Sequence, residues 1–235
     1  MLTITPLTRT ELLKCMPERK TIAEIGVWNG HFAADILKNC TPRELHLVDP
    51  WGGGDDAYVK TYNIKHDMQA KYEAVLSMFS EEIKAGTVKV HRTHSYSWLP
   101  TVPDGGLDWL YLDGMHTYEA VEQDLAHIDK KIADDGFIVG HDFSNYHKRG
   151  FGVVSAVRDF VRKRGYKLLL ITLEPDPTYV IAKAPGGAVE ALVSKVIRAN
   201  GQVIQMDEQL LDGFYQTPLV LEDNKRLNLF NFKKP

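Results

Sequence analysis

The sequence predicts an α/β domain with a Rossmann-like, mostly parallel sheet that helices cover on both faces. The first observation is that short β-rich runs alternate with longer stretches of helical period through residues 1–185. The second is that several of these runs, such as Leu107–Asp113, are apolar through most of their length. Strands that are buried on both faces require this composition. The two observations predict one core domain at residues 1–185.

Seven segments have the length and composition of strands. They are Thr21–Val27, Glu44–Asp49, Thr87–Arg92, Leu107–Asp113, Gly136–Asp142, Tyr166–Leu173 and Thr178–Ala182. A turn signal at Asp176-Pro177 separates the last two segments, so we expect them to form an antiparallel pair at one edge of the sheet.

Apolar residues at helical spacing predict the helices between these strands. The stripes are Met68, Tyr72, Val75, Leu76, Phe79 and Ile83; Val121, Leu125, Ile128 and Ile132; and Val153, Val157, Phe160 and Val161. A further helix is expected at Ala188–Ala199, after Pro185-Gly-Gly. Residues 186–235 are therefore expected to form a C-terminal helix and a tail, which packs on the core, covers the site as a lid or binds a partner.

Composition and charge exclude several classes of protein. The 235 residues carry a formal net charge of -3, without the broad positive field of a nucleic-acid-binding protein, so a small molecule is the expected partner. No signal peptide and no apolar run long enough to cross a membrane are found, and a cytoplasmic location is expected. Cys15 and Cys40 fit packing in a reduced compartment. The long tail would suit a homodimer.

The segment at residues 23–33, AEIGVWNGHFA, joins the first predicted strand to a helix. Gly26 would let a ligand approach the backbone, and Gly30 would permit a sharp turn into the helix. Glu24 would lie beside this turn, where a carboxylate can accept hydrogen bonds from an ammonium group. S-adenosylmethionine carries such an ammonium on its methionine end, whereas a carboxylate would repel the pyrophosphate of a dinucleotide.

Asp49 closes the next predicted strand, about 20 residues beyond Gly26. An acid at this place in an open α/β sheet reaches the ribose hydroxyls of a nucleoside cofactor. The spacing also suits a dinucleotide, but the Gly-x-Gly-x-x-Gly pattern is absent, which disfavours an NAD-dependent dehydrogenase. The alternative is that Gly26 and Gly30 are only turn residues and that Asp49 is an exposed strand end.

These features resemble the class I S-adenosylmethionine-dependent methyltransferases. Glu24-Ile-Gly-Val-Trp-Asn-Gly matches the first glycine motif of that family and Asp49 its ribose acid, within a resemblance that covers roughly residues 20–182. The resemblance implies a seven-stranded sheet whose last strand is antiparallel. It also implies that Glu24 and Gly26 lie near the methionine part of the cofactor and that Asp49 binds the ribose.

Three further residues follow from this resemblance. Ser95 falls where the family contacts adenine, whereas His94 stands at a position that is often acidic there. Trp51, beside a run of glycines, would cap the adenine or gate the substrate, and a buried core tryptophan is the alternative.

A second group of polar residues follows two central strands. Asp113 and His116 come at the end of one strand, and His141 and Asp142 at the end of the next. Because ligands of open α/β sheets bind over the carboxyl ends of the strands, these side chains should converge where the methyl donor would lie. A histidine is the natural base near neutral pH for the proton of a hydroxyl substrate.

This second group resembles the small-molecule O-methyltransferases that include the macrocin-type sugar enzymes and, more loosely, catechol O-methyltransferase. The matching residues are Asp113-Gly-Met-His116, Tyr118, Asp124 and His141-Asp142. The resemblance implies that His116 is the general base and that Asp113 and Asp142 bind a divalent metal such as magnesium. His141 replaces an acidic ligand of the family, which suits manganese or iron(II) better than magnesium. A site without a metal is the alternative.

The expected function is transfer of a methyl group from S-adenosylmethionine to a hydroxyl oxygen of a small molecule, such as a sugar, with Asp113 and His116 catalytic. Asp113 would also border the cofactor. A non-catalytic S-adenosylmethionine-binding module and another small-molecule enzyme on the same fold are the rival functions. In the simpler structural interpretation, His116 caps the helix that begins near Thr117, His141-Asp142 fixes the next loop, and Asp124 lies on a solvated helix face.

Overall fold

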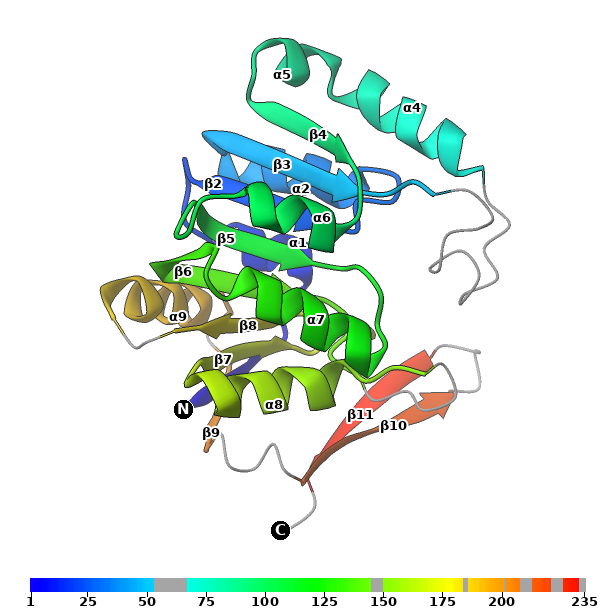
Figure 1. Cartoon of the computed structure of the whole chain (residues 1–235). Coiled ribbons are helices and arrows are strands. Elements are labelled where there is room, and N and C mark those ends of the chain that lie inside the picture. Colours follow the sequence, from blue (N-terminus) through cyan, green and yellow to red (C-terminus); the bar gives the residue numbers. More distant parts are fainter. Residues whose placement is uncertain are drawn as a thin grey trace.

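The computed structural model describes residues 1–52, 67–144, 150–183, 186–200, 202–207, 213–220 and 226–232. Within these residues, nine strands form one sheet and two more form a separate antiparallel ribbon (Figure 1). The strands of the large sheet are β1 (Leu2–Thr5), β2 (Thr21–Ile25), β3 (Glu44–Asp49), β4 (Val88–Arg92), β5 (Leu107–Leu112), β6 (Ile132–Gly140), β7 (Lys167–Thr172), β8 (Tyr179–Ala182) and β9 (Ile204–Met206). The ribbon consists of β10 (Phe214–Val220) and β11 (Arg226–Phe232).

Helices cover both faces of the large sheet. They are α1 (Arg9–Leu13), α2 (His31–Cys40), α4 (Met68–Met78), α5 (Ser80–Lys84), α6 (Ser95–Trp98), the 3-10 turn η1 (Leu99–Thr101), α7 (Tyr118–Ile128), α8 (Val153–Arg164) and α9 (Gly187–Asn200). One apolar core lies between the sheet and α6, α7 and α8, and the other lies between the sheet and α1, α2, α4 and α9. The α/β fold with helices on both faces is therefore confirmed. No helix in the described part of the chain combines the length and apolarity that crossing a membrane requires.

The strand order is β4-β3-β2-β5-β6-β8-β7-β1-β9. The four neighbouring pairs along β4-β3-β2-β5-β6 run parallel. β7 and β1 form a fifth parallel pair. β8 runs antiparallel to both β6 and β7, as the turn signal at Asp176-Pro177 predicted. All seven predicted strands are present, with bounds that differ by at most a few residues, except that β6 begins at Ile132.

The predicted number of seven strands was wrong, because β1 and β9 extend the sheet beyond β7. β7 and β8 are consequently interior strands and not the edge pair that was expected. β1 is only four residues long, too short for a periodic signal, and its place depends on pairing with β7. β9 has three residues and pairs antiparallel with β1. The division of the chain at residue 185 stays a prediction.

Two helical predictions need correction. The stripe from Met68 to Ile83 is divided between α4 and α5, because the backbone leaves the helical region at Phe79, where φ is -107° and ψ is 22°. Ile132 belongs to the start of β6 and not to the end of α7. The remaining stripe, at Val153, Val157, Phe160 and Val161, is buried on α8 as predicted.

A pair of histidines lies side by side on β3 and β4. His46 Nδ1 and His91 Nε2 are 2.9 Å apart, and both rings pack against Trp98. Burial, together with the charges of His46 and Lys89, lowers the pKa of His91 to about 4 against the opposing effect of Glu44. The folded protein therefore favours the neutral imidazole.

We expect this pair to make the protein less stable in acid. An unfolded histidine has its ordinary pKa near 6.5, so the unfolded chain binds more protons than the folded chain between about pH 6.5 and about pH 4. Stability should therefore fall as the pH drops through that window. In urea unfolding at pH 7.5 and pH 5, His91→Gln should reduce the difference between the two pH values. His127→Gln, at a half-buried position on α7 outside this pair, is the control, and an unchanged difference in His91→Gln would contradict the assignment.

Candidate functional site

The main cavity has a volume of about 470 Å³ and lies at the carboxyl edge of the sheet. It is bordered by the ends of β2, β3 and β5 and by the segments that contain α6 and α7. Its lining residues are Ile25, Gly26, Trp28, Val48, Asp49, Pro50, Gly52, Met68, His94, Ser95, Tyr96, Asp113, Gly114, Met115, Ala120, Gln123 and Asp124. The structure thus brings Gly26, Asp49, Ser95 and Asp113 to one cavity, as the sequence predicted.

Gly26 adopts a left-handed backbone with φ of +88°. A Cβ atom at this position would lie 1.9 Å from the backbone oxygen of Asp113. The reason for a glycine is therefore the close approach of the neighbouring strand end, and not only the approach of a ligand that the sequence analysis invoked. Gly30 is the residue before α2 and has φ of +80°, which agrees with the predicted turn, but it does not line the cavity.

Asp49 accepts hydrogen bonds from the backbone of two segments at the cavity wall, the one that follows β2 and the one that follows β3. Its Oδ2 accepts a hydrogen bond from the Trp28 backbone N–H at 2.9 Å, and its Oδ1 accepts one from the Trp51 backbone N–H at 2.7 Å. The carboxylate is buried and oriented, so the alternative of an exposed strand end does not apply.

Trp51 lies in the protein core and not in the cavity wall. Its side chain is 1% exposed, its indole Nε1–H donates to the Trp28 carbonyl at 2.8 Å, and its ring packs against Tyr72. This position matches the alternative of a buried core tryptophan. The neighbouring glycines 53 and 54 lie outside the described residues.

Glu24 is fully buried on β2 and does not line the cavity. Its Oε2 has no hydrogen-bond partner within the described residues. Burial raises the pKa of Glu24 well above its ordinary value, the charges of Asp113 and Asp49 raise it further, and Arg9 opposes the shift. Such an orphaned oxygen under the glycine turn suits a site that receives a hydrogen-bond donor or a cation on ligand binding.

Four polar side chains meet at the ends of β5 and β6. His116 Nε2 lies 2.8 Å from Asp142 Oδ2 and 3.4 Å from Asp113 Oδ1. His141 Nδ1 lies 3.2 Å from Asp142 Oδ2 and 3.6 Å from Asp113 Oδ1. The sequence therefore predicted the members of this cluster correctly, although their roles stay predictions. We refer to Asp113, His116, His141 and Asp142 as the Asp–His cluster.

The local backbone explains how these side chains are presented. Thr117, not His116, caps α7, because its side chain accepts a hydrogen bond from the Ala120 backbone N–H. His116 is not the cap and instead contacts the carboxylates of the cluster, and its ring stacks on Phe151 with a 4.7 Å separation of centroids. Asp142 has a strained φ of +52°, a conformation that side chains rarely adopt and that is concentrated at functional sites.

Electrostatic forces in the cluster are strong and mutual. Burial lowers the pKa of His116, but hydrogen bonds with Asp113 and Asp142 outweigh it and raise the pKa to about 9. Hydrogen bonds with the same two carboxylates likewise outweigh the effect of burial at His141 and raise its pKa to about 10. Burial acts to raise the pKa of Asp142, yet hydrogen bonds with the two histidines hold it well below its ordinary value. The carboxylates therefore favour the protonated form of each imidazole.

Asp113, His141 and Asp142 also have the chemistry of a metal site. Each offers one ligand atom, and the three atoms lie within 4.8 Å of one another. Two carboxylates and one imidazole fit manganese or iron(II), and they fit magnesium less well because magnesium prefers oxygen ligands.

Sequence reasoning missed one residue near the site and misjudged the surroundings of another. Arg9 on α1 extends its guanidinium over the Phe32 ring, with Nη1 3.5 Å from both Asp113 Oδ2 and the Tyr111 hydroxyl. Its position depends on how α1 folds against the sheet, and no local motif marks it. Asp124, expected on a solvated helix face, is instead buried and lines the cavity.

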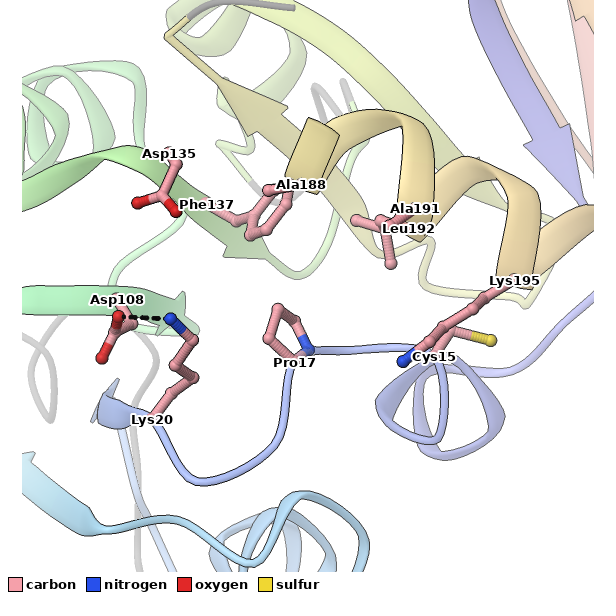
Figure 2. A pocket seen from close by; sticks show the side chains of 10 residues that line it. All are labelled: Cys15, Pro17, Lys20, Asp108, Asp135, Phe137, Ala188, Ala191, Leu192 and Lys195. Carbon is pink, nitrogen blue, oxygen red and sulfur yellow. Dashed lines mark hydrogen bonds and ion pairs between the residues drawn. The ribbon is translucent and has the colours of Figure 1, made fainter. Parts of the chain in front are cut away.

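A smaller cavity of about 200 Å³ lies at the opposite, amino edge of the sheet (Figure 2). It lies between the segment that follows α1, the starts of β2 and β5, and α9, and the Lys20–Asp108 ion pair closes one side at 2.9 Å. Its lining residues in the described chain include no predicted site residue.

Comparisons with known proteins agree with this geometry. Residues 23–143, just over half of the chain, match a family model described as a methyltransferase domain. No curated protein sequence matches the chain significantly. Among solved structures, a protein assigned as an rRNA methylase of Clostridium thermocellum has a TM-score of 0.54 and 12% identity, over 76% of this chain and 94% of that one.

Two further structures share the fold. An rRNA methylase of Streptococcus thermophilus has a TM-score of 0.51 and 9% identity, over 75% of this chain and 94% of that one. Precorrin-6y C5,15-methyltransferase of Geobacter metallireducens has a TM-score of 0.50 and 11% identity, over 73% and 83%. At such low identity these similarities concern the fold alone. The chain belongs, by the match of its central 121 residues, to the methyltransferase-domain family.

Proposed function

We propose that this methyltransferase transfers the methyl group of S-adenosylmethionine to a hydroxyl oxygen of a small molecule, such as a sugar. The observation that carries the proposal is that Asp113 belongs both to the main cavity and to the Asp–His cluster. A donor bound in the cavity would therefore have its reactive end beside the cluster. A cytoplasmic location and a homodimer remain expectations from the sequence.

The chain's own groups would hold the donor in the cavity. Asp49 presents two oriented carboxylate oxygens to ribose hydroxyls, and Gly26 keeps the strand end narrow beside the methionine part. Glu24 has a buried carboxyl oxygen, Oε2, without a hydrogen-bond partner in the described residues, and this oxygen would accept a hydrogen bond from the ammonium group. S-adenosylmethionine, when bound, supplies a methyl group activated by a sulfonium.

The Asp–His cluster would supply the acid–base chemistry. His116 would accept the proton of the acceptor hydroxyl, while Asp142 at 2.8 Å orients the imidazole. A base must be neutral, whereas the two carboxylates favour a proton on His116. A divalent cation held by Asp113, His141 and Asp142 would balance these carboxylates in place of protons and would favour the alkoxide form of the acceptor.

The test of the function is methyl transfer from labelled S-adenosylmethionine to matched panels of hydroxylated small molecules and of ribosomal RNA. We expect labelled product with at least one sugar or phenol, together with S-adenosylhomocysteine in equal amount. Incorporation into RNA alone, or binding of S-adenosylhomocysteine without transfer to any hydroxyl compound, would refute the proposal.

The metal preference is a separate prediction. We expect Mn²⁺ to bind more tightly than Mg²⁺ and EDTA to reduce turnover, because the donor set includes His141. Asp142→Asn should weaken Mn²⁺ binding at least about tenfold in calorimetry, and His141→Glu should narrow the preference for Mn²⁺ over Mg²⁺. Asp159→Asn, remote from the three ligand atoms, is the control. If Mn²⁺ gives no binding heat and EDTA no effect, the cluster works without a metal.

A further inference from the structure

The β10–β11 ribbon meets the core of the domain beside the Asp–His cluster. Phe214, the first residue of β10, is buried and belongs to the apolar core between the sheet and α6, α7 and α8. The centroid of its ring lies 5.5 Å from that of Phe143. Phe143 directly follows Asp142, so one side chain connects the C-terminal tail to the cluster.

The backbone at Asp142 depends on its neighbours for support. Its φ of +52° is a conformation that persists only where the surrounding structure fixes it. On one side, the His141 N–H donates to the Leu112 carbonyl at 3.0 Å. On the other side, the Phe143 N–H donates to the Pro177 carbonyl at 2.9 Å. These two bonds hold the chain before and after Asp142, and the strained residue lies between them.

The ring of Phe143 provides a third support. It is 1% exposed and packs in tilted contacts against Tyr179, at 5.6 Å and 51°, and against Phe214, at 5.5 Å and 42°. Tyr179 belongs to β8 of the sheet, whereas Phe214 comes from the tail. Loss of the Phe214 ring would leave a cavity beside Phe143, and the surrounding side chains relax into such a cavity only in part.

A shift of Phe143 would be passed to the side chain of Asp142 through the backbone. Asp142 Oδ2 lies 2.8 Å from His116 Nε2 and 3.2 Å from His141 Nδ1. A displacement of about 1 Å would take both contacts beyond hydrogen-bond distance or change their angles. A misplacement of this size, even when a distant mutation causes it, can lower the rate of an enzyme by about 100-fold.

We propose that Phe214 is a positioning residue for the Asp–His cluster, which acts through Phe143 to hold Asp142 in the orientation that contacts His116. The effect on turnover rests on the proposed function, whereas the effect on the geometry of the cluster does not. Phe214 lies outside residues 23–143, which match the family model, so the tail of this chain contributes to a site that the matched segment carries.

The test uses the full chain with Phe214→Ala. We expect kcat to fall by about 10- to 100-fold, because Asp142 loses its orientation, while the KM of the acceptor and the affinity for S-adenosylhomocysteine change little. At a fixed pH, the imidazole proton resonances of His116 and His141 should shift, and those of His91 on β4 should not. Phe214→Leu fills part of the cavity and should lie between wild type and Phe214→Ala in both measurements.

Two control variants separate positioning from general stability. Phe160→Ala removes a ring of similar exposure, 6% against 7%, from the same core, where it packs against Tyr166 with centroids 4.8 Å apart. It should lose a similar amount of stability in urea unfolding but keep kcat and the resonances of the cluster. Tyr215→Ala, at the exposed next position of β10, should behave as wild type in both measurements.

Unchanged resonances of His116 and His141 in Phe214→Ala would overturn the inference, and so would an unchanged kcat. A raised KM with wild-type kcat would also overturn it, because the ribbon would then contact the acceptor instead of positioning the cluster. If wild type methylates no hydroxyl compound, the proposed function fails, and the histidine resonances alone decide whether Phe214 positions the cluster.

Discussion

His116→Ala should lower kcat for methyl transfer by about 10²- to 10⁴-fold, the usual contribution of a general base. Binding of S-adenosylhomocysteine should change little, because His116 does not line the main cavity. Both quantities are accessible, the first from the initial rate with an acceptor that wild type methylates and the second from calorimetry.

The His116→Ala variant also removes an imidazole that pairs with two carboxylates, which can change the stability of the fold. Loss of His116 leaves Asp113 and Asp142 with one imidazole fewer between them, so each variant needs a thermal unfolding curve. His127→Ala, a half-buried histidine on α7 and outside the Asp–His cluster, is the control and should keep full activity. Wild-type turnover in His116→Ala would remove this residue from the mechanism.

Gly26→Ala should be the most disruptive small substitution at the site. The new Cβ would lie 1.9 Å from the Asp113 backbone oxygen, and the φ of +88° is unfavourable for alanine. We expect about 2–4 kcal/mol of lost stability in urea unfolding. Turnover should fall about 100-fold even at a temperature where the variant is folded. Asp113 must move to make room for the new methyl group, and a displacement of a site residue by about 1 Å can lower the rate by that factor.

Gly86→Ala is the comparison that isolates the clash. Gly86 has a similar φ of +78°, but nothing lies within 4 Å of its Cβ position. It should therefore lose only the strain of about 1–2 kcal/mol and keep its activity. If Gly26→Ala is no worse than Gly86→Ala in both assays, the strand ends of β2 and β5 tolerate separation and the close approach is not needed.

The sheet was predictable where its strands are long and buried. Leu107–Leu112 and Phe137–Gly140 are apolar on both faces, so their composition alone indicated interior parallel strands. β1 and β9 were not predictable, because three or four residues contain no period and gain their structure from pairing with distant segments. The break at Phe79 was equally hidden, since the apolar stripe continues through it.

The site was predictable to the extent that its residues follow strands. Asp49, Asp113, His141 and Asp142 come at the carboxyl ends, which parallel topology places together. Trp51 was ambiguous because burial of a loop tryptophan depends on packing against Tyr72, which is remote in the sequence.

Arg9 and Asp124 reach the same edge from helices. Arg9 reaches it because α1 packs beside α2, and Asp124 because α7 turns one face toward the sheet. A helical face shows in a sequence only when it is apolar, so a buried carboxylate among charged neighbours is read as solvated. Sequence reasoning therefore missed Arg9 and the burial of Asp124, although it named most of the other residues at this edge.

The place of β1 between β7 and β9 bears on how the chain folds. Ile4 is aligned with both Ile171 and Ile204, so β1 cannot be paired on either side until the chain through β7 has been made. Closing loops of this size costs entropy that only the late contacts repay. Docking of the first five residues should accordingly be a slow, final event in refolding, visible as late amide protection at Thr3 and Thr5.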